Sequence, residues 1–183
     1  MQALVYKSTG SHYLVKTASG LWRQARLKGR MKIEGSTSTN PVAVGDWVLL
    51  EGDDDPENTL IAEVQTRHNY INRISPHNKH QHHIVAANLD QSLLFATLKE
   101  PKTSTGFIDR FLVTSEAYHI PAILVINKVD LVQEEELLND LIQRYEAIGY
   151  RVLCVSLKIG IGVATLKEIL QGKTSLLSGH SGV

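Results

Sequence analysis

The chain has 183 residues, in which 19 Lys and Arg residues balance 19 Asp and Glu residues. This length is sufficient for two small domains with hydrophobic cores, and the zero net charge means that any nucleic-acid binding must depend on local basic patches. The single cysteine, Cys154, excludes a disulfide framework and favours the cytoplasm. No apolar run is long enough to cross a membrane, and the N-terminus has no signal-peptide pattern.

Residues 1–68 contain short strand-like runs separated by turn residues. The turns include Gly10-Ser11, Ser19-Gly20 and an acidic turn at 53–56. Five short strands in this span predict a small all-β Greek-key barrel, for which an OB-fold is the natural candidate. The expected strands are residues 3–7, 13–17, 21–27, 47–51 and 60–65.

Basic residues and one tryptophan gather around the second and third of these strands. OB-folds bind nucleic acid through this face by aromatic stacking and by cationic side chains. We therefore predict an RNA-binding surface here, with the acidic turn facing away from RNA. The alternative is a solvated charged face, with the tryptophan partly in the core. The predicted RNA-binding residues are Trp22, Arg23, Arg26, Lys28 and Arg30, with Lys32 close by.

Residues 69–85 are expected to link the barrel to a second domain. They carry His77, His80, His82 and His83. Clustered histidines can bind zinc, but no cysteine lies nearby and their spacing suits no usual structural site. We therefore predict no metal site in this chain and interpret the histidines as surface residues or as part of a linker close to RNA.

Strands and helices alternate in residues 86–183, and short loops connect them. This pattern predicts an α/β domain with a parallel sheet, whose ligands bind at the carboxyl ends of the strands. The expected strands are residues 92–96, 121–126, 151–155 and 175–177, and the expected helices are 106–118, 134–148 and 163–170.

A polar loop, Asn127-Lys128-Val129-Asp130, follows the second of these strands. The Asp130 carboxylate can accept two parallel hydrogen bonds from the N1–H and the exocyclic amine of guanine, a pair that adenine does not offer. Asn127 can tie the loop to neighbouring backbone and touch the purine N7 edge, and the stem of Lys128 can lie over the base while its ammonium stays in water. The alternative is an ordinary strand-to-helix turn in which Asp130 caps a helix.

Two further loops follow strands of the same predicted sheet. Ser156-Leu157-Lys158 occupies the place of a second guanine-contacting loop, although in isolation it reads as a plain loop. Gly179-His180-Ser181-Gly182-Val183 reads as the front of a phosphate-binding loop, in which backbone N–H groups converge on an anion. The alternative for the last five residues is a Ser/Gly-rich tail.

The guanine loop precedes the phosphate loop, whereas ordinary GTPases have the opposite order. In this order the chain resembles the first part of the ribosome small-subunit-dependent GTPase A family, which are circularly permuted GTPases. The resemblance covers nearly the whole length. The matching stretches are residues 41–48 (PVAVGDWV), 86–91 (AANLDQ), 127–131 (NKVDL), 148–150 (IGY) and 179–183 (GHSGV).

The resemblance implies an N-terminal OB-fold, a P-loop-type GTPase domain from residue 86 that is permuted and incomplete, and a zinc-binding domain outside this chain. It implies GTP or GDP with Mg²⁺ as ligands, and the small ribosomal subunit and its rRNA as partners of a cytoplasmic monomer. The intact protein is expected to assist late subunit maturation, with GTP hydrolysis coupled to release. The chain itself is expected to stop inside the phosphate loop, before the lysine and the Mg²⁺-binding hydroxyl, so we predict no catalytic residue and no hydrolysis within it.

Two alternatives remain open at this point. The chain can be a non-catalytic OB-fold RNA-binding module with a vestigial nucleotide-binding half. It can also be a different permuted GTPase that acts on the large subunit, although such proteins generally lack an OB-fold in front.

Overall fold

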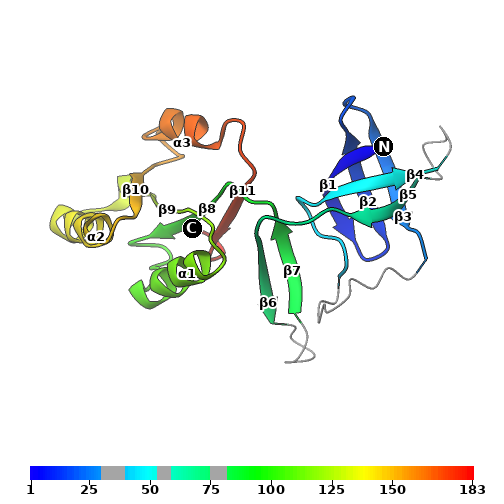
Figure 1. Cartoon of the computed structure of the whole chain (residues 1–183). Helices are drawn as coiled ribbons and strands as arrows, with labels where there is room; N and C mark the ends of the chain where they lie inside the picture. Colours follow the sequence, from blue (N-terminus) through cyan, green and yellow to red (C-terminus); the bar gives the residue numbers. More distant parts are fainter. Residues whose placement is uncertain (30–39, 53–58, 75–81) are drawn as a thin grey trace. The chain divides into compact units, whose positions relative to one another are not determined.

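The computed structural model describes residues 1–29, 40–52, 59–74 and 82–183. These residues fall into two units, Met1–Asn88 and Leu89–Val183 (Figure 1).

The first unit contains a closed five-stranded barrel, as the sequence predicts. The barrel order is β1-β2-β3-β5-β4, in which β3 and β5 are parallel and the other pairs are antiparallel (Figure 1). Each predicted strand is present, with small differences at the ends. The strands are β1 (Gln2–Thr9), β2 (His12–Thr17), β3 (Trp22–Leu27), β4 (Trp47–Glu51) and β5 (Thr59–Val64).

The alternation of apolar and polar residues determines which side chains fill the barrel. Alternate residues of one strand point to opposite faces of a sheet, so every second residue of each strand enters the interior. The buried apolar residues of this core are Ala3, Val5, Tyr13, Val15, Ala25, Val42, Val48, Leu50 and Ile61.

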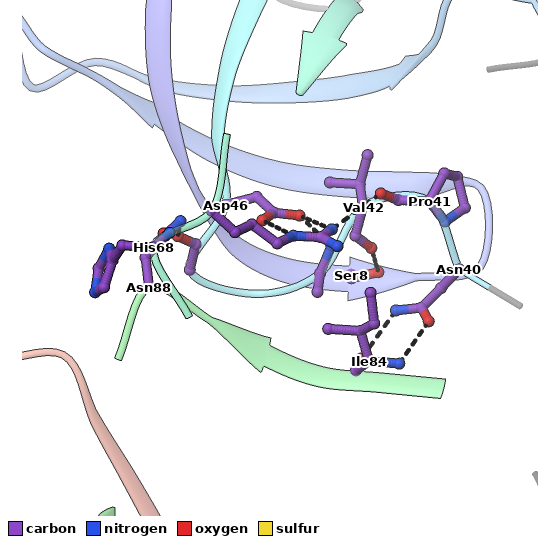
Figure 2. Close-up of polar contacts among 11 residues, drawn as sticks. Ser8, Asn40, Pro41, Val42, Asp46, His68, Ile84 and Asn88 are labelled. Carbon is purple, nitrogen blue, oxygen red and sulfur yellow. Dashed lines mark hydrogen bonds and ion pairs between the residues drawn. The ribbon is translucent and has the colours of Figure 1, made fainter. Parts of the chain in front are cut away.

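An antiparallel hairpin lies in the segment that was expected to be a linker. It consists of β6 (Tyr70–Ile74) and β7 (His82–Ala87), which the sequence pattern did not predict. An isolated β-bridge joins Val44 to Ala86, and the side-chain amide of Asn40 pairs with both backbone groups of Ile84 at 2.9 Å (Figure 2). The hairpin is therefore attached to the barrel by its backbone. The division into residues 1–68, 69–85 and 86–183 by function stays a prediction.

A buried ion pair lies at the base of this attachment. The carboxylate of Asp46 is fully buried and accepts two hydrogen bonds of 2.7 Å from the guanidinium of Arg67 and one of 2.8 Å from the backbone N–H of Ala43 (Figure 2). Asn88 donates to the carbonyl of Gly45 at 2.9 Å and accepts from the backbone N–H of His68. These bonds satisfy the polar groups that packing of the hairpin removes from water.

The second unit is a parallel sheet with helices on both faces. The sheet order is β10-β9-β8-β11, and all three pairings are parallel (Figure 1). The predicted strands and helices are present, with a short 3-10 helix at Val129–Leu131 in addition. The elements are β8 (Gln91–Thr97), α1 (Thr105–Ala117), β9 (Ala122–Asn127), α2 (Glu135–Ala147), β10 (Arg151–Cys154), α3 (Val163–Leu170) and β11 (Ser175–Gly179).

Adjacent residues of the central strands pack into two different hydrophobic cores, one on each face of the sheet. Leu94 packs with α1 and α2, whereas its neighbour Leu93 packs with α3. The helices α1 and α2 therefore cover one face of the sheet and α3 the other, which explains the continuous apolar runs of β8 and β9.

The carboxyl ends of the four strands lie at one edge of this sheet. Thr97 at the end of β8 pairs with Asn127 at the end of β9, Cys154 pairs with Ile126, and Gly179 pairs with Phe95. The loops that follow β9, β10 and β11 therefore begin side by side, where parallel sheets bind their ligands. Among the described residues, no helix is both long and apolar enough to cross a membrane.

Candidate functional site

The loop after β9 has the backbone of a tight turn. Lys128 adopts a left-handed conformation with φ of 58°, and the 3-10 helix Val129–Leu131 follows it. The helix α2 begins only at Glu135, with Glu134 as its N-cap, so the alternative role of Asp130 as the cap of that helix is wrong. Asp130 therefore does not cap α2, and its carboxylate can accept other hydrogen bonds.

A hydroxyl of the next loop holds the Asp130 carboxylate. Ser156 Oγ donates a 2.5 Å hydrogen bond to Asp130 Oδ1, and Ser156 is itself buried. The backbone connects the same two loops, because the N–H of Val129 donates to the carbonyl of Val155 at 3.3 Å. Of the two carboxylate oxygens, only Oδ1 has a hydrogen bond within the described part of the chain. One side of the carboxylate is thus fixed, and the other is available to a ligand.

Asn127 contributes a buried polar atom that lacks a partner. Its side chain is largely buried at the end of β9, and Oδ1 accepts no hydrogen bond from the described residues. Buried polar atoms without a hydrogen bond are rare in folded proteins, and each one indicates that a bound group can supply the bond. The side-chain amide thus keeps hydrogen-bonding capacity at the edge of the sheet where Asp130 lies.

The loop after β10 presents the other two residues of the second predicted motif to solvent. Leu157 and Lys158 are both exposed, whereas Ser156 forms a bridge with Ile161 that closes the loop. Gly160 donates its N–H to the carbonyl of Ser156 at 2.8 Å. The loop therefore fixes the hydroxyl and leaves the following side chains accessible.

The loop after β11 starts in close contact with the sheet. A Cβ on Gly179 would lie 2.8 Å from the carbonyl oxygen of Phe95, so the backbone approaches β8 more closely than a side chain allows. The His180 ring lies against Phe107 of α1, with 3.9 Å between ring centroids. Gly182 has φ of 82°, and the N–H of Val183 donates to the carbonyl of His180 at 3.3 Å. Ser181 lies exposed in this turn.

Lys128 links three loops. Its ammonium donates to the carbonyl of Gly182 and to the carbonyl of Glu100 in the loop after β8, each at 2.5 Å. From the sequence we expected this ammonium to be in water. The contact with Glu100 was not expected, because a backbone acceptor leaves no signal in the sequence. The structure brings the three predicted loops together at one edge of the sheet.

The predicted RNA-binding residues of the barrel differ in exposure. Trp22 is 51% exposed and does not belong to the barrel core, whereas the choice between an RNA-binding face and a solvated charged face stays a prediction. Arg26 is exposed and Arg23 is half-buried, whereas Lys28 forms an exposed ion pair with Glu51. Arg30, Lys32 and the acidic turn lie outside the described residues.

The histidines of the expected linker are only partly described. His82 and His83 lie on β7, whereas His77 and His80 lie outside the described residues. In the described ranges, no group of three or more His, Cys, Asp or Glu side chains is placed to hold a metal ion.

Two family models match the chain. Residues 2–60 match the RsgA N-terminal domain and residues 64–183 match the RsgA GTPase. A Bacteroides thetaiotaomicron protein named small ribosomal subunit biogenesis GTPase RsgA 2 is 49% identical over 189 residues, which cover the whole chain and 59% of that protein. A Cytophaga hutchinsonii protein named small ribosomal subunit biogenesis GTPase RsgA is 47% identical over 187 residues, which cover the whole chain and 61% of that protein.

Two solved structures are similar to this chain over almost its whole length. YjeQ from Thermotoga maritima superposes with a TM-score of 0.78 at 30% identity, over 99% of this chain and 60% of that one. YloQ, described as a circularly permuted GTPase, superposes with a TM-score of 0.75 at 28% identity over the same shares. The chain spans about three fifths of the length of these relatives. On the fold and on both family matches, the chain belongs to the RsgA family.

Proposed function

We propose that the whole protein is a GTPase that binds the small ribosomal subunit, assists its late maturation and couples GTP hydrolysis to release. One observation carries the nucleotide part of this proposal. Three loops at the carboxyl edge of one parallel sheet are tied together, by the bond from Ser156 to Asp130 and by the bond from Lys128 to Gly182. The names of the relatives in Bacteroides and Cytophaga support the ribosomal part.

We assign guanine recognition to the loops after β9 and β10. Asp130 Oδ2 is available to accept a guanine N–H group, and the buried amide of Asn127 lies at the same edge. The proposed base-binding residues are Asn127, Lys128, Val129, Asp130, Ser156, Leu157 and Lys158.

We assign phosphate binding to Gly179, His180, Ser181, Gly182 and Val183, which follow β11. Gly179 and Gly182 allow backbone N–H groups to approach an anion, as glycine-rich loops do in nucleotide sites. Mg²⁺ bound with the nucleotide would neutralise phosphate charge. None of these five residues is assigned a catalytic role.

We assign rRNA binding to the barrel surface with Trp22, Arg23, Arg26, Lys28 and Arg30. The exposure of Trp22 and Arg26 supports this assignment. Because Lys28 already pairs with Glu51, we expect it to contribute less than Arg26. The resemblance to the family further supports a cytoplasmic monomer and a zinc-binding domain in the whole protein.

The proposal is tested with the whole protein and purified ribosomal subunits. We expect hydrolysis of GTP but not of ATP, cosedimentation with small subunits in a non-hydrolysable GTP analogue, and release when GTP replaces the analogue. Hydrolysis of ATP at the same rate as GTP would exclude guanine recognition. Cosedimentation with large subunits alone would instead favour a permuted GTPase of the other subunit.

A further inference from the structure

Two aromatic side chains lie on the outer surface of the barrel, although the core is the usual place for them. Tyr6 of β1 is 48% exposed and Trp22 of β3 is 51% exposed. Their ring centroids are 4.8 Å apart with an angle of 68° between the planes. The ammonium of Lys16 lies 5.3 Å from the centroid of the Trp22 ring. These three residues are here called the Tyr6–Trp22–Lys16 corner.

The strand register explains why three residues distant in the sequence meet on this face. Lys16 pairs directly with Trp22 across β2 and β3, and it pairs with Leu4 across β1 and β2. The register between β1 and β2 shifts between Val5 and Lys7, which leaves Tyr6 unpaired at a bulge. Bulges re-aim a side chain, and here the bulged residue reaches a ring two strands away.

The corner has the shape and charge to bind a planar, anionic ligand. Two rings at a steep angle let a flat ring lie on one of them with its edge against the other, a favourable aromatic arrangement. Lys16 supplies a cation beside the Trp22 ring, and the exposed Arg26 lies on the same face of β3 four residues after Trp22. A nucleotide combines a flat base with a phosphate and fits both features.

We propose that the Tyr6–Trp22–Lys16 corner stacks an unpaired base of single-stranded RNA. The inference rests on the proposed rRNA binding by the barrel and specifies which form of RNA this surface takes. A duplex hides the faces of its bases, so only a loop, bulge or single strand can offer one to an aromatic ring. The corner thereby gives the barrel a preference for unpaired segments, which the cationic side chains alone do not provide.

The test measures binding of the 183-residue chain to two RNAs with the same number of phosphates, a single-stranded oligouridine and a duplex. Trp22→Leu should weaken binding to the single strand about tenfold and leave binding to the duplex unchanged. Trp22→Tyr keeps a ring and should retain most of the affinity. Trp47→Leu makes the same chemical change on β4, outside the corner, and should have no effect. Lys16→Gln should reduce the salt slope by about one.

The outcomes separate this inference from the function on which it rests. If Arg26→Ala weakens binding to both RNAs while Trp22→Leu does not, the barrel binds RNA but the corner takes no base. Equal losses for the single strand and the duplex, or equal losses for Trp22→Leu and Trp22→Tyr, would also overturn the inference. If the wild-type chain binds neither RNA, the proposed RNA surface and the corner both fail. Unchanged thermal unfolding of each variant shows that the barrel remains folded.

Discussion

Ser156 holds the carboxylate that we assign to base recognition. It is buried, its hydroxyl donates to Asp130, and its backbone N–H donates to the carbonyl of Ile161 at 2.9 Å, which fixes the backbone that carries the hydroxyl. A carboxylate held in one orientation loses less conformational freedom when a base binds to it. We therefore expect Ser156 to contribute to nucleotide affinity through the position of Asp130.

We expect Ser156→Ala in the whole protein to weaken GDP binding about tenfold, because a hydrogen bond to a charged group contributes about 1.5–3 kcal/mol. Titration with a fluorescent GDP analogue measures this change. Ser8→Ala is the control, since it also removes one hydroxyl bond, to the carbonyl of Val42, in the other unit. Equal affinities of wild type and Ser156→Ala would show that Asp130 needs no such support.

Gly45 is required where β7 meets the barrel. It has φ of 90°, and a Cβ at this position would lie 2.0 Å from the carbonyl oxygen of Ala87. Gly45→Ala should lower the free energy of unfolding of the first unit by about 3 kcal/mol, from backbone strain and the clash together. Both tryptophans, Trp22 and Trp47, belong to this unit, so urea unfolding followed by tryptophan fluorescence reports on it.

Gly20 provides the matched control for this experiment. It has φ of 87°, but a Cβ there would meet nothing within 4 Å. Gly20→Ala should therefore lower the free energy of unfolding by only about 1 kcal/mol, the cost of the left-handed conformation. If the free energy of unfolding falls equally in both variants, the close approach of Gly45 to Ala87 does not contribute to stability.

Residue patterns indicated contacts between motif side chains better than contacts that involve the backbone. Asp130 and Ser156 both belong to recognisable motifs, and they are bonded to each other in the structure. The contact of Lys128 with Glu100 uses a carbonyl, which any residue could supply. The buried pair of Asp46 and Arg67 is equally hidden in the sequence, because charged residues are usually exposed and nothing local indicates that these two meet.

At the scale of elements, periodicity predicted those that bury one clear face. The helices α1, α2 and α3 and the strands of the barrel and of the parallel sheet fall close to their expected ranges. The hairpin of β6 and β7 was not predicted, because its contacts come from a distant part of the chain and not from a local sequence pattern. Val44 and Asn40 contact β7 from a part of the chain more than twenty residues before β6. Tertiary contacts of this kind override weak local preferences.

The contact between α1 and α2 predicts a dependence on alkaline pH. Tyr145 of α2 is buried and donates a 2.8 Å hydrogen bond to Asp109 of α1. Burial, with the bond to Asp109, raises the pKa of Tyr145 to about 12. In the unfolded chain the phenol titrates near 10, so the stabilisation is complete below that pH and is lost as the pH rises from about 10 to 12.

The free energy of unfolding of the second unit should therefore fall by about 1 kcal/mol more between pH 9 and 11 in the wild type than in Tyr145→Phe. The helices of the described residues all belong to this unit, so the helical circular dichroism signal follows its unfolding. Tyr13 and Tyr150, whose pKa burial also raises, titrate in both proteins and cancel in the comparison. A parallel pH dependence of the two proteins would contradict the role of Tyr145.

At the scale of the whole molecule, the order of motifs along the chain differs from their order in space. The proposed guanine loop follows β9 and the proposed phosphate loop follows β11, yet β11 pairs with β8 and both loops open at one edge of the sheet. A permuted chain can thus build the same nucleotide site, because the site depends on which strand ends are adjacent and not on which strand comes first. The sequence predicted this arrangement because each motif directly follows an apolar strand.

The central claim is that Asp130 reads the guanine base, and Asp130→Asn in the whole protein tests it most directly. An amide offers a donor where guanine also presents one, whereas xanthine presents a carbonyl there. Titration with GTP and with xanthosine triphosphate should show a loss of GTP affinity and a gain of affinity for the xanthine nucleotide. Unchanged affinity for GTP, with no gain for xanthosine triphosphate, would contradict the assignment of the guanine site to the loop after β9.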